Sequence, residues 1–315
     1  MPHLTENYYL NFYGGEPLLS FELIKQTISL LNNANKESGK KSDYSITTNG
    51  SLLSYKIIQF LDEHKFSVEL SFDGLAQDKS RQKGSVKRIV PIIQELLECP
   101  NIDLETNSVF SPDTVSYLSE SIKFIMELGV SDIRFSISTT KPWDQASLMK
   151  LENELVEVRK ILLSHHKKNG HIPVVNFRDV HEKGIFHCTA GKDRLTISPD
   201  GGVWGCFLFA DYFRERENSL EYQDYYYGNL EDFMKNHEEI FPRISSNYAQ
   251  LSMDNFCTSK GECFLCKEFK NCAVCPINAA LSGAPIGQIP DHICEIQKIR
   301  RREKEKFSED IQKLA

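Results

Sequence analysis

The sequence CFLCKEFKNCAVC, residues 263–275, places four of the chain's nine cysteines within a single short stretch. It consists of two Cys-x2-Cys pairs, Cys263–Cys266 and Cys272–Cys275, separated by five residues. Two cysteines at this spacing can turn both sulfur atoms toward one metal ion or toward one face of an iron–sulfur cluster. The stretch therefore predicts a cysteine-ligated metal site.

Three further cysteines extend the pattern. Cys188 and Cys206 flank residues 198–202, with the sequence SPDGG, and Cys294 follows the second pair. An Asp-Gly dipeptide between two apolar segments is typical of a β-hairpin, so we expect strands at Leu195–Ser198 and Val203–Cys206. Seven clustered thiols exceed the four that one zinc ion binds, which favours two metal centres or one centre with spare cysteines.

Two other chemistries fit a cysteine-rich chain. A disulfide framework is disfavoured because no apolar targeting segment opens the sequence, which indicates a reducing cytosol. Structural zinc on Cys263, Cys266, Cys272 and Cys275 remains an alternative, since paired Cys-x2-Cys is also the ligand pattern of zinc ribbons. The five residues between the pairs are few for a ribbon. Iron and sulfur are therefore the preferred interpretation.

The order of these seven cysteines resembles the SPASM domain, the C-terminal extension of radical S-adenosylmethionine (SAM) enzymes that modify peptides and sulfatases. One departure is visible: two residues, Ala273 and Val274, separate the last pair where the family usually has three. The resemblance implies two auxiliary 4Fe–4S clusters. Carried over by position, Cys188, Cys206 and Cys275 would ligate the first cluster, and Cys263, Cys266, Cys272 and Cys294 the second.

The resemblance leaves the fourth ligand of the first cluster open. Family members often supply a cysteine shortly before the Cys188 position, and this chain has none there. His187, Cys257 or an open iron can fill the place. Cys99 is interpreted as an ordinary half-buried thiol at a helix end.

Composition excludes several classes of protein. The 315 residues are 40% hydrophobic and 26% charged, with a net charge of −7, so the chain is long enough for two packed cores but lacks the basic surface that nucleic acid requires. No apolar stretch approaches the ~20 residues that cross a bilayer. We therefore expect a soluble, cytoplasmic protein that binds neither nucleic acid nor membrane.

Residues 1 to about 140 alternate short apolar runs with amphipathic segments, as in repeated strand–helix units on a parallel sheet. Strands are predicted at Tyr8–Tyr13, Tyr44–Thr48, Ser67–Phe72, Ile102–Val109 and Ile133–Ser138, with a further one at Ile172–Phe177. A partial or whole α/β barrel fits this pattern, and a doubly wound sheet is the alternative.

Three of the predicted strands end in glycine-containing motifs: Gly14-Gly15-Glu16-Pro17, Thr47-Thr48-Asn49-Gly50 and Ser71-Phe72-Asp73-Gly74, the last followed by Arg81. Each is a weak signal alone, because such dipeptides are common in turns. Together and in this order they resemble the strand ends with which radical SAM enzymes hold their cofactor. The resemblance implies a SAM site formed by Gly14, Gly15, Glu16, Pro17, Asn49, Ser71, Asp73 and Arg81.

The Cys-x3-Cys-x2-Cys motif that holds the SAM-activating cluster in this family is absent from the 315 residues. The sequence therefore predicts a partial (β/α) barrel of the radical SAM type without its first strand, followed by a small cysteine-rich α+β SPASM domain. The predicted boundaries are 1–142 for the barrel, 143–180 for a bridging helix and strand, 181–296 for the SPASM domain and 297–315 for a C-terminal helix. The chain is expected to be a truncated form or a homologue that has lost reductive SAM cleavage.

By resemblance, the function is maturation of a ribosomally made peptide or of a protein such as a sulfatase, through hydrogen abstraction by a 5′-deoxyadenosyl radical. The implied partners are a peptide or protein substrate and a reductant such as a flavodoxin or ferredoxin. SAM and its own 4Fe–4S cluster belong to an intact form. The alternative is a non-catalytic, iron–sulfur or zinc-containing scaffold that binds peptides. The sequence names no catalytic residue.

Overall fold

The computed structural model describes residues 5–178, 188–251, 257–258, 262–267, 269, 272, 274–281 and 283–314. The chain forms two compact units. The first, here called the sheet unit, comprises Met1–Ser138, Met149–Asp179 and Glu303–Ala315. The second, here called the cysteine unit, comprises Thr139–Leu148 and Val180–Arg302.

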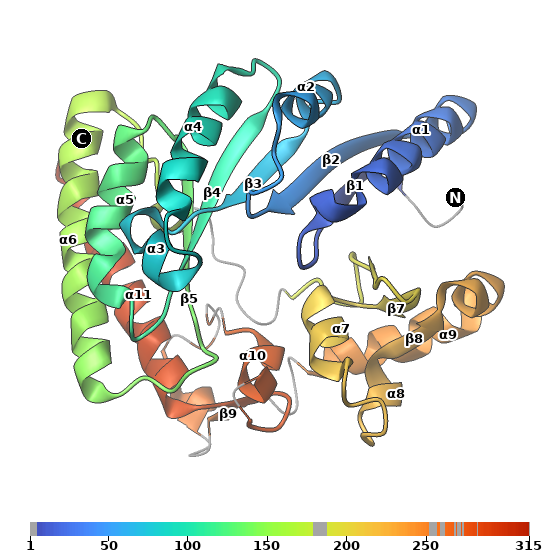
Figure 1. Cartoon of the computed structure of the whole chain (residues 1–315). Helices are drawn as coiled ribbons and strands as arrows, with labels where there is room; N and C mark the ends of the chain where they lie inside the picture. The colour runs from blue at the N-terminus through green and yellow to red at the C-terminus, as the bar shows by residue number, and fades with distance from the viewer. Residues whose placement is uncertain are drawn as a thin grey trace. The chain divides into compact units, whose positions relative to one another are not determined.

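The sheet unit contains five parallel strands that lie side by side in the order of the sequence (Figure 1). They are β1 (Asn7–Phe12), β2 (Lys41–Thr48), β3 (Ser67–Ser71), β4 (Asp103–Phe110) and β5 (Asp132–Ile137). Each strand begins and ends within three residues of its predicted bounds. The pattern of short apolar runs thus identified the whole sheet.

Helices connect consecutive strands. The longer ones are α1 (Phe21–Ser38), α2 (Tyr55–Glu63), α4 (Ser85–Glu98) and α5 (Leu118–Glu127). Short pieces are η1 (Pro17–Ser20), η2 (Gly74–Ala76), α3 (Gln77–Ser80) and η3 (Val115–Tyr117). A chain that adds every strand at the same edge of a sheet keeps its helices on one face, whereas a doubly wound sheet reverses direction and needs helices on both. The partial barrel is therefore the observed architecture.

The two faces of this sheet differ in chemistry. Val68 and Leu70 of β3 and Ile133 of β5 are fully buried on the face that the helices cover. Apolar residues on the helices meet them, among them Ile28, Ile58, Leu61, Ile93, Leu96, Ile122 and Ile125. Burial of each such side chain contributes about 1.5–3 kcal/mol, so this layer holds the unit together. The opposite face carries polar side chains.

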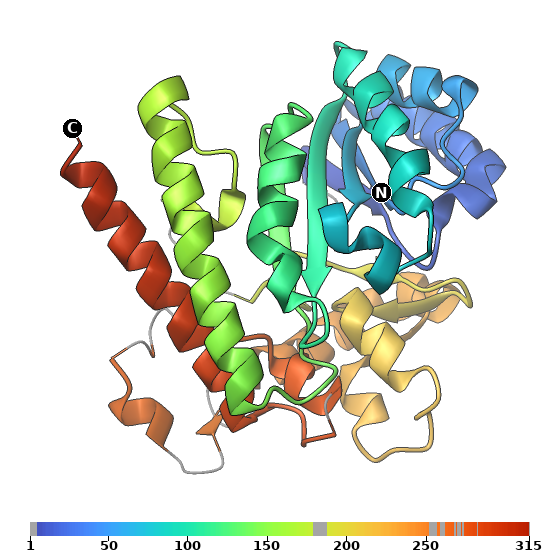
Figure 2. The same cartoon turned by 60° about the vertical axis from the view of Figure 1, so that its left-hand side comes forward.

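Helix α6 (Gln145–Asn169) and helix α11 (Asp291–Gln312) run side by side, as Figure 2 shows. In the sheet unit, Arg159 of α6 donates from Nε to the fully buried carboxylate of Glu303 at 3.1 Å and also bonds Asp310. Lys306 Nζ contacts the other oxygen of Glu303 at 2.7 Å. Two cations thus neutralise one buried anion, which links helices that lie about 140 residues apart in sequence.

The strand predicted at 172–177 is wrong except at one residue. Val174 forms a single bridge with Ile133, and η4 (Val175–Phe177) follows. The Asn176 side-chain amide takes over the pairing: its Oδ1 accepts from Phe135 N and its Nδ2 donates to Phe135 O, both at 3.0 Å. A side chain that imitates a peptide group satisfies the outer edge of β5 without another strand.

The cysteine unit contains the predicted hairpin, formed by β6 (Thr196–Ile197) and β7 (Gly202–Trp204), and β8 (Tyr226–Asn229) pairs with β7. The turn places Gly201 at φ +83°, a conformation that favours glycine. The unit also contains α7 (Phe207–Phe213), α8 (Tyr222–Tyr225), α9 (Leu230–Gln250), α10 (Pro276–Leu281), and the parallel pair β9 (Cys257–Thr258) and β10 (Gln288–Ile289). A 3-10 helix, η6, spans Glu262–Leu265.

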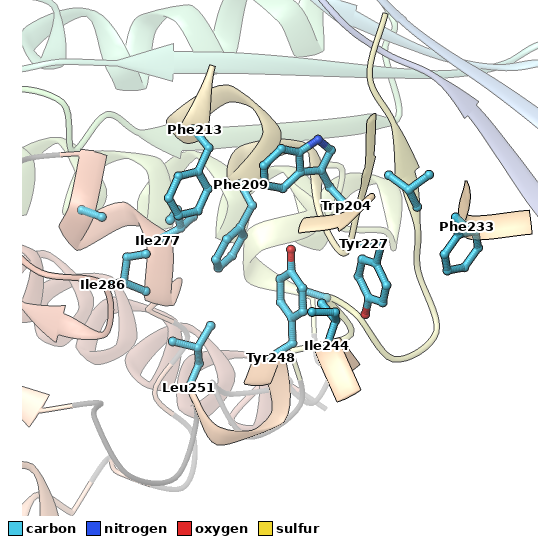
Figure 3. Close-up of a cluster of buried hydrophobic side chains, with 13 residues drawn as sticks. Trp204, Phe209, Phe213, Tyr227, Phe233, Ile244, Tyr248, Leu251, Ile277 and Ile286 are labelled. Carbon is cyan, nitrogen blue, oxygen red and sulfur yellow. The ribbon is translucent and has the colours of Figure 1, made fainter. Parts of the chain in front are cut away.

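Aromatic residues form the core of this unit (Figure 3). Tyr248 lies in its centre, where its ring packs against Phe209 and Tyr227 with centroids 4.8 and 6.0 Å apart. Its hydroxyl accepts a hydrogen bond from Gly205 N at 3.0 Å and donates one to Tyr225 O at 2.9 Å. The buried hydroxyl is thus fully satisfied, which fixes the segment beside Cys206.

Candidate functional site

The loop after β1 contains the first predicted SAM-binding motif. An added Cβ at Gly14 or Gly15 would meet no atom within 4 Å, so the backbone of both residues is open to a ligand. Glu16 caps η1 by accepting from Leu18 N at 3.2 Å, and Pro17 stands at the start of that helix, where its fixed φ is favourable. The Glu-Pro half of the motif therefore shapes the loop, and the Gly-Gly half faces outward.

The carboxylate of Glu16 also joins this loop to the end of β2. Its Oε1 accepts from Thr48 Oγ1 at 2.7 Å and its Oε2 accepts from Asn49 N at 2.9 Å. With the bond from Leu18, both oxygens are occupied by the protein. We infer that Glu16 holds the first two strand ends together, and that the backbone of the loop, not this carboxylate, is available to a cofactor.

Asp73, after β3, is 1% exposed and receives four hydrogen bonds. Ser80 Oγ and Arg81 Nε donate to Oδ2 at 2.5 and 2.8 Å, while Val109 N and Arg81 Nη2 donate to Oδ1 at 2.8 and 3.2 Å. This set ties the end of β3 to α3 and to β4. Asp73 therefore fixes the direction of Arg81, whose Nη1 has no hydrogen-bond partner among the described residues.

Other side chains at these strand ends have hydrogen-bonding groups that the described residues do not use. Ser71 is half-buried, and its hydroxyl has no hydrogen-bond partner in the part of the chain that the structure describes. Asn49 uses Oδ1 to accept from Ser51 N at 2.8 Å, which leaves its amide donors available. An open glycine backbone, a hydroxyl, an amide and a guanidinium suit the ammonium, carboxylate and ribose groups of SAM. The eight predicted residues thus gather at the carboxyl ends of three adjacent strands.

Sequence reasoning missed a polar network on the face of the sheet opposite the helices, below the strand ends. Arg134 of β5 forms a bidentate pair with Glu105 of β4, with Nε–Oε1 at 2.7 Å and Nη2–Oε2 at 3.0 Å. Asn107 Nδ2 donates to Glu69 Oε1 at 3.3 Å. The sequence did contain a signal for this network. Polar residues alternate with apolar ones along three predicted strands, whereas the strands of a parallel sheet are normally apolar on both faces.

In the cysteine unit, Cys188, Cys206 and Cys275 pack against the same aromatic core. Gly191 N donates to Gly205 O at 3.1 Å, which holds the segments carrying Cys188 and Cys206 against each other. A Cβ at Gly205 would stand 2.6 Å from Gly191 N, so only glycine permits this approach. Burial raises the pKa of Cys206, and burial together with the nearby Cys206 and Cys188 raises the pKa of Cys275 to about 12.

The remaining predicted ligands form a second group. Cys263, Cys272 and Cys294 pack against Val274, Ile289 and Ile293. Burial raises the pKa of Cys272, and the charges of Cys263 and Cys266 raise it further. Burial likewise raises the pKa of Cys294, with Cys263 and Cys272 among the charges that contribute. Crowded, buried thiols of this kind become thiolates when a cation compensates their charge, as iron does in a cluster.

No three His, Cys, Asp or Glu side chains among the described residues surround a point where one metal ion could bind. Among the described residues, none of the eight cysteines whose side chains are described forms a disulfide. Of the proposed fourth ligands, His187 lies outside the described residues, and only the backbone of Cys257, in β9, is described.

Comparison with curated proteins relates the chain to a radical SAM enzyme. It is 26% identical over 330 aligned residues, covering 96% of this chain, to the radical SAM cyclopropyl synthase TigE of Paramaledivibacter caminithermalis. It is 27% identical over 205 residues, covering 62% of this chain, to an uncharacterised protein of Methanocaldococcus jannaschii. No model of a known protein family matches the sequence.

Comparison with solved structures shows a shared fold. The structure of native anSMEcpe with bound AdoMet has a TM-score of 0.73 at 17% identity and covers 99% of this chain and 85% of that one. Native anSMEcpe with AdoMet and the Cp18Cys peptide has a TM-score of 0.71 at 17% identity, covering 100% and 88%. SuiB of Streptococcus suis bound to S-adenosylmethionine gives 0.52 at 18% identity, covering 91% and 65%. The chain therefore resembles a radical SAM enzyme in sequence and shares the fold of these AdoMet-bound structures.

The chain spans 62% of the length of TigE. Its five-stranded sheet and its cysteine unit both fall within the structural match to anSMEcpe, because that match covers 99% of the chain. Among the described residues, no helix is long and apolar enough to cross a membrane. The fold class predicted from the sequence is confirmed.

Proposed function

We propose that this chain takes part in radical SAM modification of a ribosomally made peptide or of a protein, by binding SAM at the strand ends of the sheet unit and two auxiliary iron–sulfur clusters in the cysteine unit. The observation that carries the proposal is that one chain combines the fold of the AdoMet-bound structures with an open Gly14–Gly15 backbone and two separate groups of thiols.

At the strand ends, each group has an assigned part. The peptide groups of Gly14 and Gly15 bind the ammonium group of the methionyl part of SAM. Arg81, directed by Asp73, and the Ser71 hydroxyl bind its carboxylate, since a guanidinium and a hydroxyl both donate to anions. Asn49 donates its amide to the ribose. Glu16 and Pro17 keep the loop in shape.

In the cysteine unit, Cys188, Cys206 and Cys275 hold one cluster and Cys263, Cys266, Cys272 and Cys294 the other. When bound, these clusters supply an iron that anchors substrate or a centre that accepts an electron. The aromatic core around the first thiol group excludes water, and Tyr248 keeps the segment of Cys206 in place. A peptide or protein substrate and a reductant such as a flavodoxin or ferredoxin are the proposed partners.

The cysteine triplet that holds the SAM-activating cluster is not among the 315 residues. The proposal therefore gives these residues the binding of SAM, of substrate and of the auxiliary clusters, and it assigns them no part in the reductive cleavage of SAM. The scaffold alternative shares the clusters and the peptide but needs no SAM, so SAM binding separates the two.

SAM binding is measured by isothermal titration calorimetry on the full chain. Gly15→Val fills the open space over the loop, and we expect it to weaken SAM binding at least about tenfold, which is about 1.4 kcal/mol. Gln26→Val is the control, because Gln26 is exposed on helix α1. Absence of any SAM binding by the unaltered chain would contradict the SAM part of the proposal.

The clusters are tested by iron and sulfide analysis after anaerobic reconstitution. Two 4Fe–4S clusters give about eight irons per chain and a brown protein. Cys275→Ala and Cys263→Ala should each remove about half of the iron, one from each group. Cys99→Ala is the matched control, since Cys99 ends helix α4 far along the chain from both groups. A colourless protein with bound zinc would instead support the zinc-containing scaffold.

A further inference from the structure

The face of the sheet opposite the helices is polar on β2, β3, β4 and β5. Partners in a parallel register point to the same side, and the register pairs Thr47 with Glu69, Glu69 with Glu105, and Asn107 with Arg134. The opposite side holds fully buried Val68 and Leu70. A parallel sheet with one polar face is unusual, because such sheets are normally buried between apolar layers. The face therefore suits a polar ligand.

The charges on this face do not cancel. Arg134 engages both oxygens of Glu105, so that pair is internally neutral. Glu69 lies beside it with a single side-chain donor, the Asn107 amide at 3.3 Å. No ion pair joins Glu69 to a cation within the described residues. Among Glu69, Glu105 and Arg134, one negative charge is therefore left over, on β3, the middle strand of the sheet.

The surroundings of Glu69 disfavour an isolated charge. Partial burial raises the pKa of its carboxyl, and the charge of Glu105 adds to the rise, against the opposing effects of Asn107 and Arg134. On the same face, Ser45 is 6% exposed and its hydroxyl has no partner in the described part of the chain. Buried polar groups normally have hydrogen-bond partners. The Ser45 hydroxyl and the Glu69 carboxylate therefore need partners from outside the described part of the chain.

The partner that the Glu69 carboxylate lacks is a cation. Neither a metal ion nor the ammonium group of SAM fits this place. A metal ion is disfavoured because no three acidic, histidine or cysteine side chains converge on one point in the described residues. The ammonium of SAM is assigned to the Gly14–Gly15 loop at the strand ends. Glu69 lies two residues inside β3 from Ser71, which is about 6.6 Å along the strand.

We propose that Glu69 binds the positively charged side chain of a lysine or arginine in the peptide substrate, with Asn107 and the Glu105–Arg134 pair fixing the direction of its carboxylate. This inference rests on the proposed function, since it specifies the peptide that the same sheet unit receives. Asn107 and Glu105 are positioning residues, because they act through Glu69. An ammonium or guanidinium supplies the charge and the donors that this carboxylate lacks.

The test is affinity selection from a synthetic library of random octapeptides with acetylated N-termini and amidated C-termini, so that the peptides carry charge only on side chains. The full chain is the bait, and bound peptides are sequenced by mass spectrometry. The unaltered chain should enrich Lys and Arg at one position by about tenfold, as a charge-assisted hydrogen bond worth about 1.4 kcal/mol predicts.

Glu69→Gln should remove this enrichment while peptides still bind, and Glu69→Lys should replace it with enrichment of Asp and Glu. The exposed Glu120→Gln, on helix α5, is the control and should leave the Lys and Arg enrichment unchanged. Circular dichroism is used to check that each variant folds. If Glu69→Lys does not fold, the comparison of Glu69→Gln with the unaltered chain is sufficient to test the inference.

Two results would overturn the inference. If peptides are enriched without Lys or Arg, or keep that preference in Glu69→Gln, the assignment of Glu69 is wrong while peptide binding stands. If no peptide is enriched over bait-free beads, the peptide part of the proposed function fails and takes this inference with it. The calorimetric SAM experiment is independent of both results.

Discussion

Replacing Asp73 by Asn tests whether this carboxylate organises the strand ends. The change keeps the size of the side chain but turns one acceptor oxygen into an NH2 donor. That group then faces Arg81 Nε, which can only donate and now bonds the carboxylate at 2.8 Å, whereas Ser80 Oγ can turn its hydrogen to Ala76 O and accept. The oxygen that remains can still accept from Val109 N.

The expected cost follows from these contacts. The bond from Arg81 Nε is lost and the other three lose the charge of the carboxylate, where a hydrogen bond to a charged group contributes about 1.5–3 kcal/mol. The side chain of Arg81 is 29% exposed, so water replaces part of its lost bond, whereas Asp73 is almost fully buried. We therefore expect Asp73→Asn to lower the free energy of unfolding by about 2–4 kcal/mol.

The assay is urea unfolding of the full chain followed by far-UV circular dichroism. Asp103→Asn is the matched control, because Asp103 is exposed at the start of β4, and it should change stability by less than about 0.5 kcal/mol. A cost below that value for Asp73→Asn would refute the claim that this carboxylate joins β3 to α3 and β4. In that case its role would have to be direct contact with the cofactor.

Three further changes probe other parts of the chain. Burial and the charge of Glu105 raise the pKa of Glu69, with Arg134 opposing, so the folded state binds the proton of this carboxyl more tightly than the unfolded state does. The stability of the unaltered chain relative to Glu69→Gln should therefore fall as pH rises from the ordinary Glu pKa of about 4.3 through the raised value. Parallel pH dependences of the two chains in urea unfolding would contradict this. Arg159→Met leaves the buried Glu303 in contact with the cation Lys306 and should lower the free energy of unfolding by about 3 kcal/mol. Lys160→Met, in an exposed ion pair, should lower it by less than about 1 kcal/mol. Equal losses of stability would argue against the buried network. Tyr248→Phe leaves Gly205 N without its acceptor and should lower the free energy of unfolding by about 1–3 kcal/mol, and an unchanged urea midpoint would show that water replaces the hydroxyl.

The local signals in the sequence were sufficient for much of the fold. Apolar alternation located all five parallel strands, and Asp200-Gly201 located the hairpin, because each depends on residues that are neighbours along the chain. The same reasoning predicted a strand at 172–177, where Asn176 pairs with β5 through its side chain instead. Sequence periodicity does not distinguish a backbone amide from a side-chain amide, so this error has a clear origin.

The sequence alone determined which residues carry the chemistry: the cysteines with their spacing and the glycine motifs that follow three strands. The tertiary structure decided how they act. It showed that the carboxylates of Glu16 and Asp73 accept hydrogen bonds from the protein itself. It also showed that the thiols pack on two separate cores, one with Cys188, Cys206 and Cys275 and the other with Cys263, Cys272 and Cys294. It also brought Glu69, Glu105 and Arg134 together from three strands. Hydrogen bonds and charges act between atoms that are close in space, and only the folded chain sets those distances.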